Sequence, residues 1–485
     1  MPVRKRSLLA LSVATCSLAS CTFAPAYHPP VTPTPAIFRE AGPWAPARPA
    51  DLASRGNWWS IYGDATLNRL EQRIATDNPT LAGALARYDQ ASAYLRQAHS
   101  GLLPTIGVSA DIERARQSDT RPLRGSNQPD IYGAATTEVG ISYELDLWGR
   151  VRNSVAAGKA EAEASADDVA AIRLSLEAQL ATSYFALRGY DQQIALLSAT
   201  VDAYAKADAM TERRFRGGIA SGVDTGRSGT QLAEAQAQLA DVRAARALSE
   251  HAIASLVGTP ASDFSIASAV VPIVLPAIPT GLPATLLERR PDVAASERRM
   301  AAANLGIGVA KAAFFPAITL GAQGGFQSSG FPGLFSAPNT LWSIGPGAVL
   351  NLFDGGRRRA QLAVARANWS QATASYRGHV LQAFQEVEDS LAELHHLGDE
   401  SEAEDRAVQQ AGQTEALSLN RYVKGAVTYL DVVTAQTTAL RTRRVALDLT
   451  TRRLQASIGL IRATGGGWVD PASPHFTDQT SRYAR

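Results

Sequence analysis

Residues 290–316 read RPDVAASERRMAAANLGIGVAKAAFFP, and residues 78–104 read NPTLAGALARYDQASAYLRQAHSGLLP. The two stretches have the same length, and their prolines and apolar residues correspond at an offset of 212 positions: Pro79 with Pro291, Leu81 with Val293, Leu95 with Ile307, and Pro104 with Pro316. A spacing shared over so long a stretch indicates an internal duplication, with a period much longer than that of a solenoid repeat. We therefore expect two similar halves, at residues 58–270 and 284–468, joined by a proline-rich linker at 271–283.

The composition excludes several classes of protein. The chain has 485 residues and a formal net charge of +2 at pH 7, which gives no reason to expect a nucleic-acid partner. Its two cysteines, Cys16 and Cys21, both lie near the N-terminus. The rest of the sequence can therefore form neither a disulfide framework nor a cysteine-based metal site.

The sequence carries none of the motifs of a phosphate-binding loop, a serine-hydrolase elbow or a zinc protease. Of the seven histidines, only His395 and His396 are adjacent. Because neighbouring residues on a helix do not share a face, we interpret them as surface residues rather than a metal site. Gly306 and Gly308 lack the third glycine of a dinucleotide-binding fingerprint and are attributed to close helix packing. The chain is thus predicted not to be an enzyme and to need no cofactor or metal.

The N-terminus has the features of a bacterial lipoprotein. A basic triplet at 4–6 precedes an apolar run at 8–19, which predicts a signal peptide at residues 1–20. The sequence LASC at 18–21 is like a lipobox, so we expect Cys21 to carry a covalent lipid; ordinary cleavage near Ala19 is the alternative. Residues 21–57 are rich in proline and predict an extended tether. No later apolar run reaches the roughly 18 residues of a membrane helix, so we expect any membrane crossing to use strands.

Two long segments, 130–259 and 347–470, lack proline and are rich in strong helix formers. Their apolar residues recur at alternating spacings of four and three, which favours knobs-into-holes packing between helices. Each segment is interrupted once, at about 216–224 and 424–431, where Gly218 and Gly425 can take the left-handed conformation that ends a helix. A continuous helix over 150–216 would be on the order of 100 Å long at about 1.5 Å per residue. Each half is therefore predicted to contain a long helical hairpin with a tight tip, as in a conduit.

Two strands are predicted before each hairpin, from apolar residues that alternate with polar ones. Their approximate ranges are 104–117 and 136–148 in the first half, and 316–328 and 341–353 in the second, where Pro346 weakens the prediction. Such strands fit a membrane barrel with a wet lumen; a soluble sheet is the alternative. Four strands cannot close a barrel, because the smallest known barrels have about eight strands, so the chain must oligomerise. A water-filled pore favours three copies over two.

These features occur together with specific motifs: WW at 58–59, DATLN at 64–68, GLP at 281–283, LLERRPD at 286–292, GVAKAAFFP at 308–316, LQAFQEVEDSL at 381–391 and GGGW at 465–468. With them, the chain resembles the TolC-like outer-membrane efflux proteins, of the OprM/NodT-type lipoprotein branch, over about residues 58–468. The resemblance implies a mainly α fold with a membrane β-barrel. Three chains would form a trimeric α-barrel tunnel capped by a 12-stranded β-barrel, with four strands from each chain, and residues 469–485 would be a C-terminal tail.

The resemblance also implies a location and partners. The protein would be a homotrimer, lipid-anchored in the bacterial outer membrane and extending into the periplasm. It would dock to a periplasmic adaptor protein and an inner-membrane pump of the resistance-nodulation-division type. Its function would be that of a passive, gated exit duct for small molecules such as drugs. The alternatives are a duct for type I protein secretion and a non-conducting periplasmic lipoprotein.

The same resemblance places a periplasmic gate at the two hairpin tips. Leu430 matches the position of an apolar constricting ring, Asp431 that of an acidic ring, and Tyr422 and Asp224 match positions of gate contacts. Two positions depart from the family pattern: Val427 replaces a gate arginine, and Thr434 replaces a second acidic residue. We therefore expect closure to depend on packing of Leu430 more than on a salt bridge. For Asp224 and Asp431 the alternative is a helix-capping role, since Asp near a helix start satisfies free backbone amides.

Overall fold

The structure is a computed structural model, and it describes residues 22–28, 56–118, 120, 129–270, 275–276 and 290–466. The predicted signal peptide, Cys21, most of the predicted linker at 271–283 and the tail at 469–485 lie outside the described residues. None of the described helices has an apolar stretch long enough to cross a membrane.

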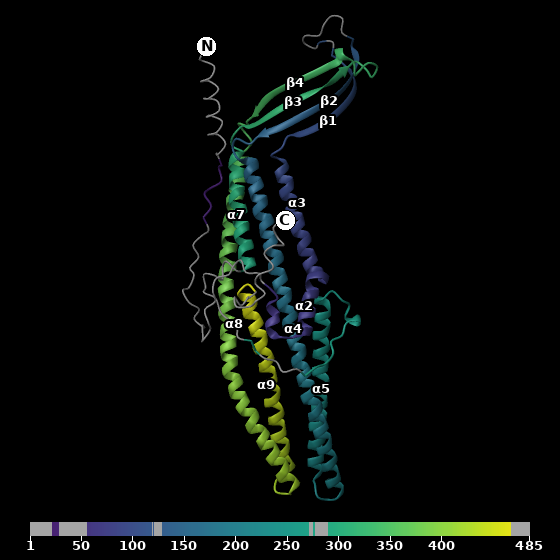
Figure 1. Cartoon of the computed structure of the whole chain (residues 1–485), viewed down its shortest axis with the longest axis vertical. Coiled ribbons are helices and arrows are strands. Elements are labelled where there is room, and N and C mark those ends of the chain that lie inside the picture. Colours follow the sequence, from purple (N-terminus) through teal and green to yellow (C-terminus); the bar gives the residue numbers. More distant parts are fainter. Residues whose placement is uncertain are drawn as a thin grey trace. The chain divides into compact units, whose positions relative to one another are not determined.

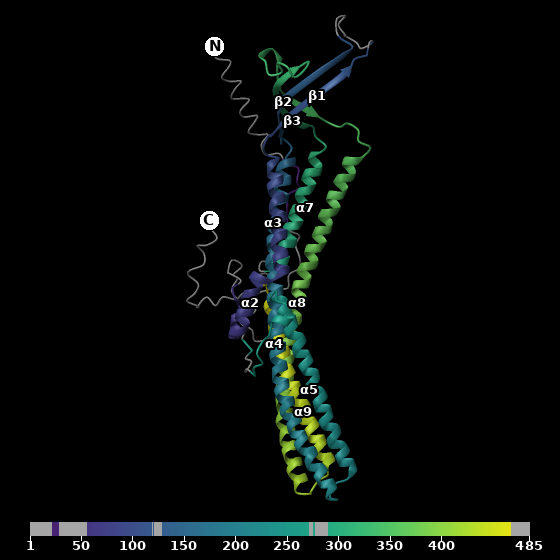
Figure 2. The same ribbon diagram turned by 90° about the vertical axis from the view of Figure 1, so that its right-hand side faces the viewer.

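The helices of the two halves have equal lengths. Helices α3 (Pro79–Ser100) and α7 (Pro291–Ala312) each have 22 residues. The long helices α4 (Arg150–Arg216) and α8 (Arg357–Val423) each have 67, and the returning helices α5 (Gly222–Leu256) and α9 (Tyr429–Ala463) each have 35. Figures 1 and 2 show α4 turning back into α5, and α8 turning back into α9. The two predicted helical hairpins are therefore present.

The chain divides into two compact units, and the first contains the sheet. Its strands are β1 (Thr105–Arg116), β2 (Ile131–Leu145), β3 (Ala317–Ser328) and β4 (Thr340–Val349), antiparallel in the order β1-β2-β3-β4. Pro346 lies within β4, which is an edge strand of this sheet, where a residue without a backbone N–H is tolerated.

The second and fourth strands end earlier than the alternation predicts, because the residues that follow them cap helices. Both carboxylate oxygens of Asp146 accept hydrogen bonds from the first amides of α4, at Val151 and Arg152. Asp354 accepts hydrogen bonds from the amides of Gly356 and Arg358 at the start of α8. The chain must therefore leave the sheet before each of these caps.

The strand register gives the sheet one apolar and one polar face. Directly paired residues point to the same side of a sheet. Two adjacent rows on one face are apolar or glycine: Ile106, Ile141, Ala322 and Ile344, then Val108, Val139, Gly324 and Trp342. The rows on the other face are polar or glycine: Thr105, Ser142, Gly321 and Gly345, then Gly107, Gly140, Gln323 and Ser343. The large apolar side chains of the first face are exposed in the single chain, up to 78% for Trp342.

The second unit is held together by a core at the start of the folded chain. The short helix η1 (Trp58–Tyr62) and helix α2 (Ala65–Asp77) bury Trp59, Leu67 and Ile74 almost completely. Asp64 caps α2 by accepting hydrogen bonds from the amides of Thr66 and Leu67, and it also accepts one from the Tyr184 hydroxyl at 2.6 Å. This unit also contains the short 3-10 helix η2 (Ala261–Asp263), and the first unit contains the short 3-10 helix η3 (Ala337–Asn339).

The residues that precede α3 and α7 make equivalent hydrogen bonds with different side chains. In the first half, the Asn78 side chain donates a hydrogen bond to the carbonyl of Leu256, the last residue of α5, at 2.7 Å. In the second half, Arg290 donates to the carbonyl of Ala463, the last residue of α9, at 3.1 Å. Arg290 is buried and also pairs with Glu386 at 2.7 Å. Each inbound helix is thereby fixed to the end of the returning helix of its own half.

Candidate gate at the hairpin tips

Both hairpin tips use the same backbone device. Gly218 and Gly425 have φ angles of 73° and 78°, in the left-handed region that residues with a side chain rarely adopt. One residue later, the amide of Ile219 donates to the carbonyl of Arg214, and that of Ala426 donates to the carbonyl of Arg421, each at 2.8 Å. These are the hydrogen bonds of a Schellman-type helix end. The two tip glycines therefore end the long helices α4 and α8 in the same geometry.

The two acidic residues predicted near the gate both cap the returning helices. The Asp224 carboxylate accepts hydrogen bonds from the amide and hydroxyl of Ser221, and the Asp224 amide donates back to the Ser221 hydroxyl. The Asp431 carboxylate likewise accepts from the amide and hydroxyl of Thr428, at 3.0 and 2.8 Å. An acid at this position also interacts favourably with the helix dipole. The capping alternative is therefore satisfied for both, and among the described residues the second carboxylate oxygen of each accepts no hydrogen bond.

Tyr422 is buried at the centre of the tip cluster, with Tyr429 and Val432. The rings of Tyr422 and Tyr429 are tilted to one another, with centroids 5.3 Å apart. The guanidinium of Arg214, from α4, lies 4.8 Å from the centre of the Tyr422 ring. Arg214 also donates hydrogen bonds to the carbonyls of Tyr422 and Val423 at the end of α8, at 3.4 and 3.1 Å, and the Tyr422 carbonyl accepts a second one from the Gly425 amide at 2.9 Å. One arginine thus joins the two hairpins.

Leu430 lies in the first turn of α9 and is 47% exposed in the single chain. Val427, at the family position of a gate arginine, packs against the Tyr422 cluster. Thr434, at the position of a second acid, donates its hydroxyl to the carbonyl of Leu430 at 2.9 Å. At these two positions the chain therefore has Val427, which packs in the tip cluster, and Thr434, which forms a hydrogen bond within its own helix.

The predicted gate residues converge only in part. Asp224, Tyr422, Gly425 and Leu430 line one cleft between the tips, of about 530 Å³, together with Arg214 and Arg227. Gly218 and Asp431 are not among its lining residues. Sequence reasoning missed Arg214 and Tyr429. Their only sequence signals were a basic residue in the last turn of α4 and an aromatic residue directly after the Thr428 cap.

The described N-terminal residues, 22–28, lie along α7 in the first unit. The Phe23 ring stacks on Phe315, with centroids 4.5 Å apart, and Phe315 in turn lies 4.9 Å from Trp148. Farther along, Asn304 donates to the carbonyl of Pro25 at 2.8 Å, and the Tyr27 hydroxyl donates to Glu297 at 2.7 Å.

Gly308 gives this N-terminal segment room. A Cβ at Gly308 would lie 2.8 Å from the Ala24 amide nitrogen and 2.6 Å from Nδ2 of Asn153, whereas one at Gly306 would meet nothing within 4 Å. The prediction that both glycines serve close helix packing is therefore wrong for Gly306. For Gly308, the close approach includes the backbone of the N-terminal segment.

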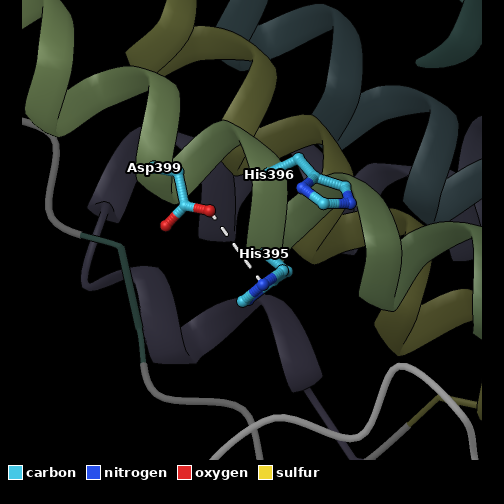
Figure 3. Close-up of side chains that lie close together, drawn as sticks. All are labelled: His395, His396 and Asp399. Atoms are coloured by element: carbon cyan, nitrogen blue, oxygen red, sulfur yellow. Dashed lines mark ion pairs between the residues drawn. The ribbon is translucent and has the colours of Figure 1, made fainter.

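Adjacent histidines on α8 come together with an acid one turn later. The ligand atoms of His395, His396 and Asp399 all lie within 4.8 Å of one another, and Figure 3 shows both rings and the carboxylate on the same side of α8. The two histidines are exposed, as the prediction of surface residues expects, but their side chains come together although neighbouring residues do not share a helix face. At about 100° per residue, Asp399 lies between the two histidines around the helix axis, and long side chains bridge the remaining angle.

The sequence matches the family described as outer membrane efflux protein over residues 70–259 and again over residues 282–466. The chain belongs to this family. The two matched segments correspond to the two halves, so the resemblance and the fold class inferred from the sequence are confirmed. The efflux protein is accordingly an outer-membrane channel of the mainly helical TolC-like fold that extends into the periplasm, and it is not an enzyme.

Several proteins are similar to this efflux protein over nearly their full length. The outer membrane protein OprJ of Pseudomonas aeruginosa is 31% identical, over 94% of this chain and 95% of OprJ. The toluene efflux pump outer membrane protein TtgF of Pseudomonas putida is 30% identical, over 97% of this chain and 98% of TtgF. Among solved structures, the outer membrane protein VceC of Vibrio cholerae has a TM-score of 0.78 at 30% identity, over 85% of this chain and 99% of VceC.

Proposed function

We propose that this efflux protein is the lipid-anchored exit duct of a tripartite efflux system for small molecules. Three copies form the duct, a periplasmic adaptor protein docks to it, and an inner-membrane pump of the resistance-nodulation-division type supplies the energy. The observation that carries the proposal is the described four-stranded sheet, with an exposed apolar face, a polar face and two edge strands that each pair on one side only.

The sheet edges support the homotrimer. Within the described sheet, β1 and β4 each pair along one side only. Unpaired backbone groups are not tolerated in lipid, and barrels have at least about eight strands. Three copies joined from β4 to β1 give a closed barrel of twelve strands. Its apolar rows, which include Ile106 and Trp342, then face lipid, and its rows of glycine, serine and glutamine face a wet lumen.

The contacts of Phe23 support the lipid anchor. Cys21 precedes Phe23 by two residues in the sequence. The Phe23 ring stacks on Phe315, which immediately precedes Pro316 and β3. Phe23, two residues after the proposed lipid attachment site in the sequence, therefore lies next to the start of β3. The aromatic group formed by Phe23, Trp148 and Phe315 suits the membrane–water interface, where aromatic side chains are enriched.

The tips form the gate in this proposal. Gly218 and Gly425 make the turns, Asp224 and Asp431 fix the start of each returning helix, and Leu430 packs against its copies around the threefold axis. Tyr422, held by Arg214, keeps the second hairpin in the closed position. Closure then depends on apolar packing and one cation–π contact, which is consistent with Val427 and Thr434 at the positions of the family's charged residues.

The names of similar proteins support small organic cargo. They include a toluene efflux pump protein and a pyoverdine export protein of Pseudomonas putida. We therefore propose that the cargo is a set of aromatic or amphiphilic compounds, such as drugs and solvents, selected by the pump rather than by this chain.

Deletion and complementation test the proposal. The deletion strain should become sensitive to several unrelated drugs or solvents, and the wild-type gene should restore resistance. The restored protein should run as a heat-modifiable trimer from outer-membrane fractions. Loss of a secreted protein, with unchanged drug and solvent sensitivity, would contradict the small-molecule function.

Labelling with radioactive palmitate tests the lipid anchor separately. It should mark the wild-type protein and not Cys21→Ser; equal labelling would contradict the lipid anchor alone.

A further inference from the structure

The cluster of His395, His396 and Asp399 lies outside the gate and is not used by the proposed duct. The His395 Nε2 and Asp399 Oδ2 atoms are 4.0 Å apart, and the two imidazole centroids are 5.1 Å apart with their planes inclined by 62°. Asp399 is four residues after His395 and three after His396, so all three groups project from the same stretch of two helical turns. Figure 3 shows the three side chains side by side.

The cluster is accessible and held on a rigid base. The side chains of His395 and Asp399 are 50% and 73% exposed. The opposite face of α8 is buried through Leu391, Leu394 and Leu397. A solute can therefore reach the three groups without opening the fold, while packing fixes the helix that carries them.

The charges near the cluster favour a cation. Within the described part of the chain, the Asp399 carboxylate lies 4.0 Å from His395 Nε2 and forms no ion pair with a lysine or arginine. The neighbouring Glu400 pairs with Arg452 at 3.7 Å, and Arg453 donates a hydrogen bond to the Ser401 hydroxyl at 3.3 Å, so both arginines make contacts with residues other than Asp399.

We propose that His395, His396 and Asp399 form a surface site for one divalent transition-metal ion, of which Zn²⁺ is the best example. Two imidazole nitrogens and one carboxylate oxygen are a donor set that suits Zn²⁺, Ni²⁺ or Cu²⁺, whereas Mg²⁺ and Ca²⁺ prefer oxygen ligands alone. Ligand atoms about 2.0–2.2 Å from a tetrahedral ion lie roughly 3.3–3.5 Å from one another. The present spacing closes to that value by small rotations of exposed side chains. The remaining coordination position stays open to water or to a ligand on the metal.

Metal titration of the full-length mature trimer tests the site. The protein is purified in detergent, its affinity tag is removed, and it is dialysed against EDTA and then against metal-free buffer. Isothermal titration with Zn²⁺ should show one ion per chain that millimolar Mg²⁺ does not displace. Co²⁺ should give the visible absorption bands of a site with nitrogen and oxygen ligands.

Variants separate this site from other histidines. The double variant His395→Ala/His396→Ala should bind Zn²⁺ at least about tenfold more weakly, since even loss of a supporting group at a metal site has that effect. Asp399→Asn should also weaken binding. His251→Ala, which removes an exposed histidine from α5, is the matched control and should bind as the wild type does. The side chains changed in these three variants are all exposed, so trimer formation and thermal stability should be unchanged. Equal Zn²⁺ affinity in the double variant and the wild type, or no Zn²⁺ binding by the wild type, would overturn the proposal.

Discussion

The guanidinium of Arg214 lies 4.8 Å from the centre of the Tyr422 ring, and Arg214 also donates a hydrogen bond to the Val423 carbonyl at 3.1 Å. Arg214 belongs to the first hairpin and Tyr422 to the second, and the two residues are 208 positions apart. This contact places a cation against both an aromatic face and the negative end of the α8 dipole. In the proposed gate, this contact replaces the one that the family resemblance assigns to an arginine at position 427.

Arg214→Ala should therefore loosen the closed tips. A partly desolvated cation–π contact contributes about 1 kcal/mol, which corresponds to roughly a fivefold change in the ratio of closed to open tips. We expect the purified trimer in planar bilayers to spend about that much more time in conducting states. Arg213→Ala is the matched control, because the neighbouring Arg213 is exposed and in the same helical turn. Identical traces for the two variants would exclude Arg214 from the gate.

Leu430→Gly should raise the single-channel conductance of the closed trimer. The substitution removes the largest apolar side chain exposed at the start of α9, and with it the packing proposed around the threefold axis. Leu430→Met keeps nearly the same volume and should conduct as the wild type does. Planar-bilayer recordings of all three proteins are the measurement. An unchanged closed-state conductance in Leu430→Gly would remove this residue from the constriction.

Gly308→Ala should free the N-terminal segment, although alanine is the better helix former by about 1 kcal/mol. The new Cβ would lie 2.8 Å from the Ala24 nitrogen, so the segment at 22–28 must move away from α7. We expect faster cleavage by chymotrypsin after Phe23 or Tyr27 in detergent-purified protein. Gly306→Ala, two residues earlier on α7, has open space around its Cβ and should leave the cleavage rate unchanged. Equal rates for the two variants would show that Gly308 does not hold the segment.

Glu71 should make the stability of the second unit depend on pH. Its side chain is 1% exposed, and neither carboxylate oxygen has a hydrogen-bond partner among the described residues. Burial, with the nearby charge of Glu177, raises the pKa of Glu71 to about 10, against the opposing effect of Arg173. The folded chain therefore keeps this proton, while the unfolded chain releases it above about pH 4.3. The stabilising contribution is complete below that pH and is lost as the pH rises towards 10.

Glu71→Gln should remove this dependence, because the amide stays neutral at every pH. For the wild type, the free energy of unfolding should fall relative to the variant by up to about 1.4 kcal/mol for each pH unit between 5 and 9. Thermal unfolding of both proteins over that range is the measurement. Glu212→Gln, which removes the acid of a surface ion pair with Arg216, is the control and should follow the wild-type curve. Parallel curves for the wild type and Glu71→Gln would contradict a buried, protonated Glu71.

The features that could be predicted from the sequence are those that depend on local patterns of a few residues. The helices follow from runs of strong helix formers without proline, and they end at Gly218 and Gly425 because glycine takes a positive φ at little energetic cost. The strands follow from alternation of apolar and polar residues, which reports the two faces of a sheet. The strand ends were less predictable, because Asp146 and Asp354 cap the next helix and so decide where each strand stops.

The sequence by itself determined the duplication, the paired long helices, the four strands and the family. Only the tertiary structure decided which side chains meet. Asn78 and Arg290 occupy equivalent positions with unlike chemistry, yet each donates to the last carbonyl of its returning helix, at Leu256 and Ala463. Arg214 likewise donates to the carbonyl of Tyr422 and lies over its ring, although the two residues are 208 positions apart. Periodicity and glycine placement act over a few residues, whereas these contacts arise when two helices of fixed length pack side by side, and no local pattern encodes the partner.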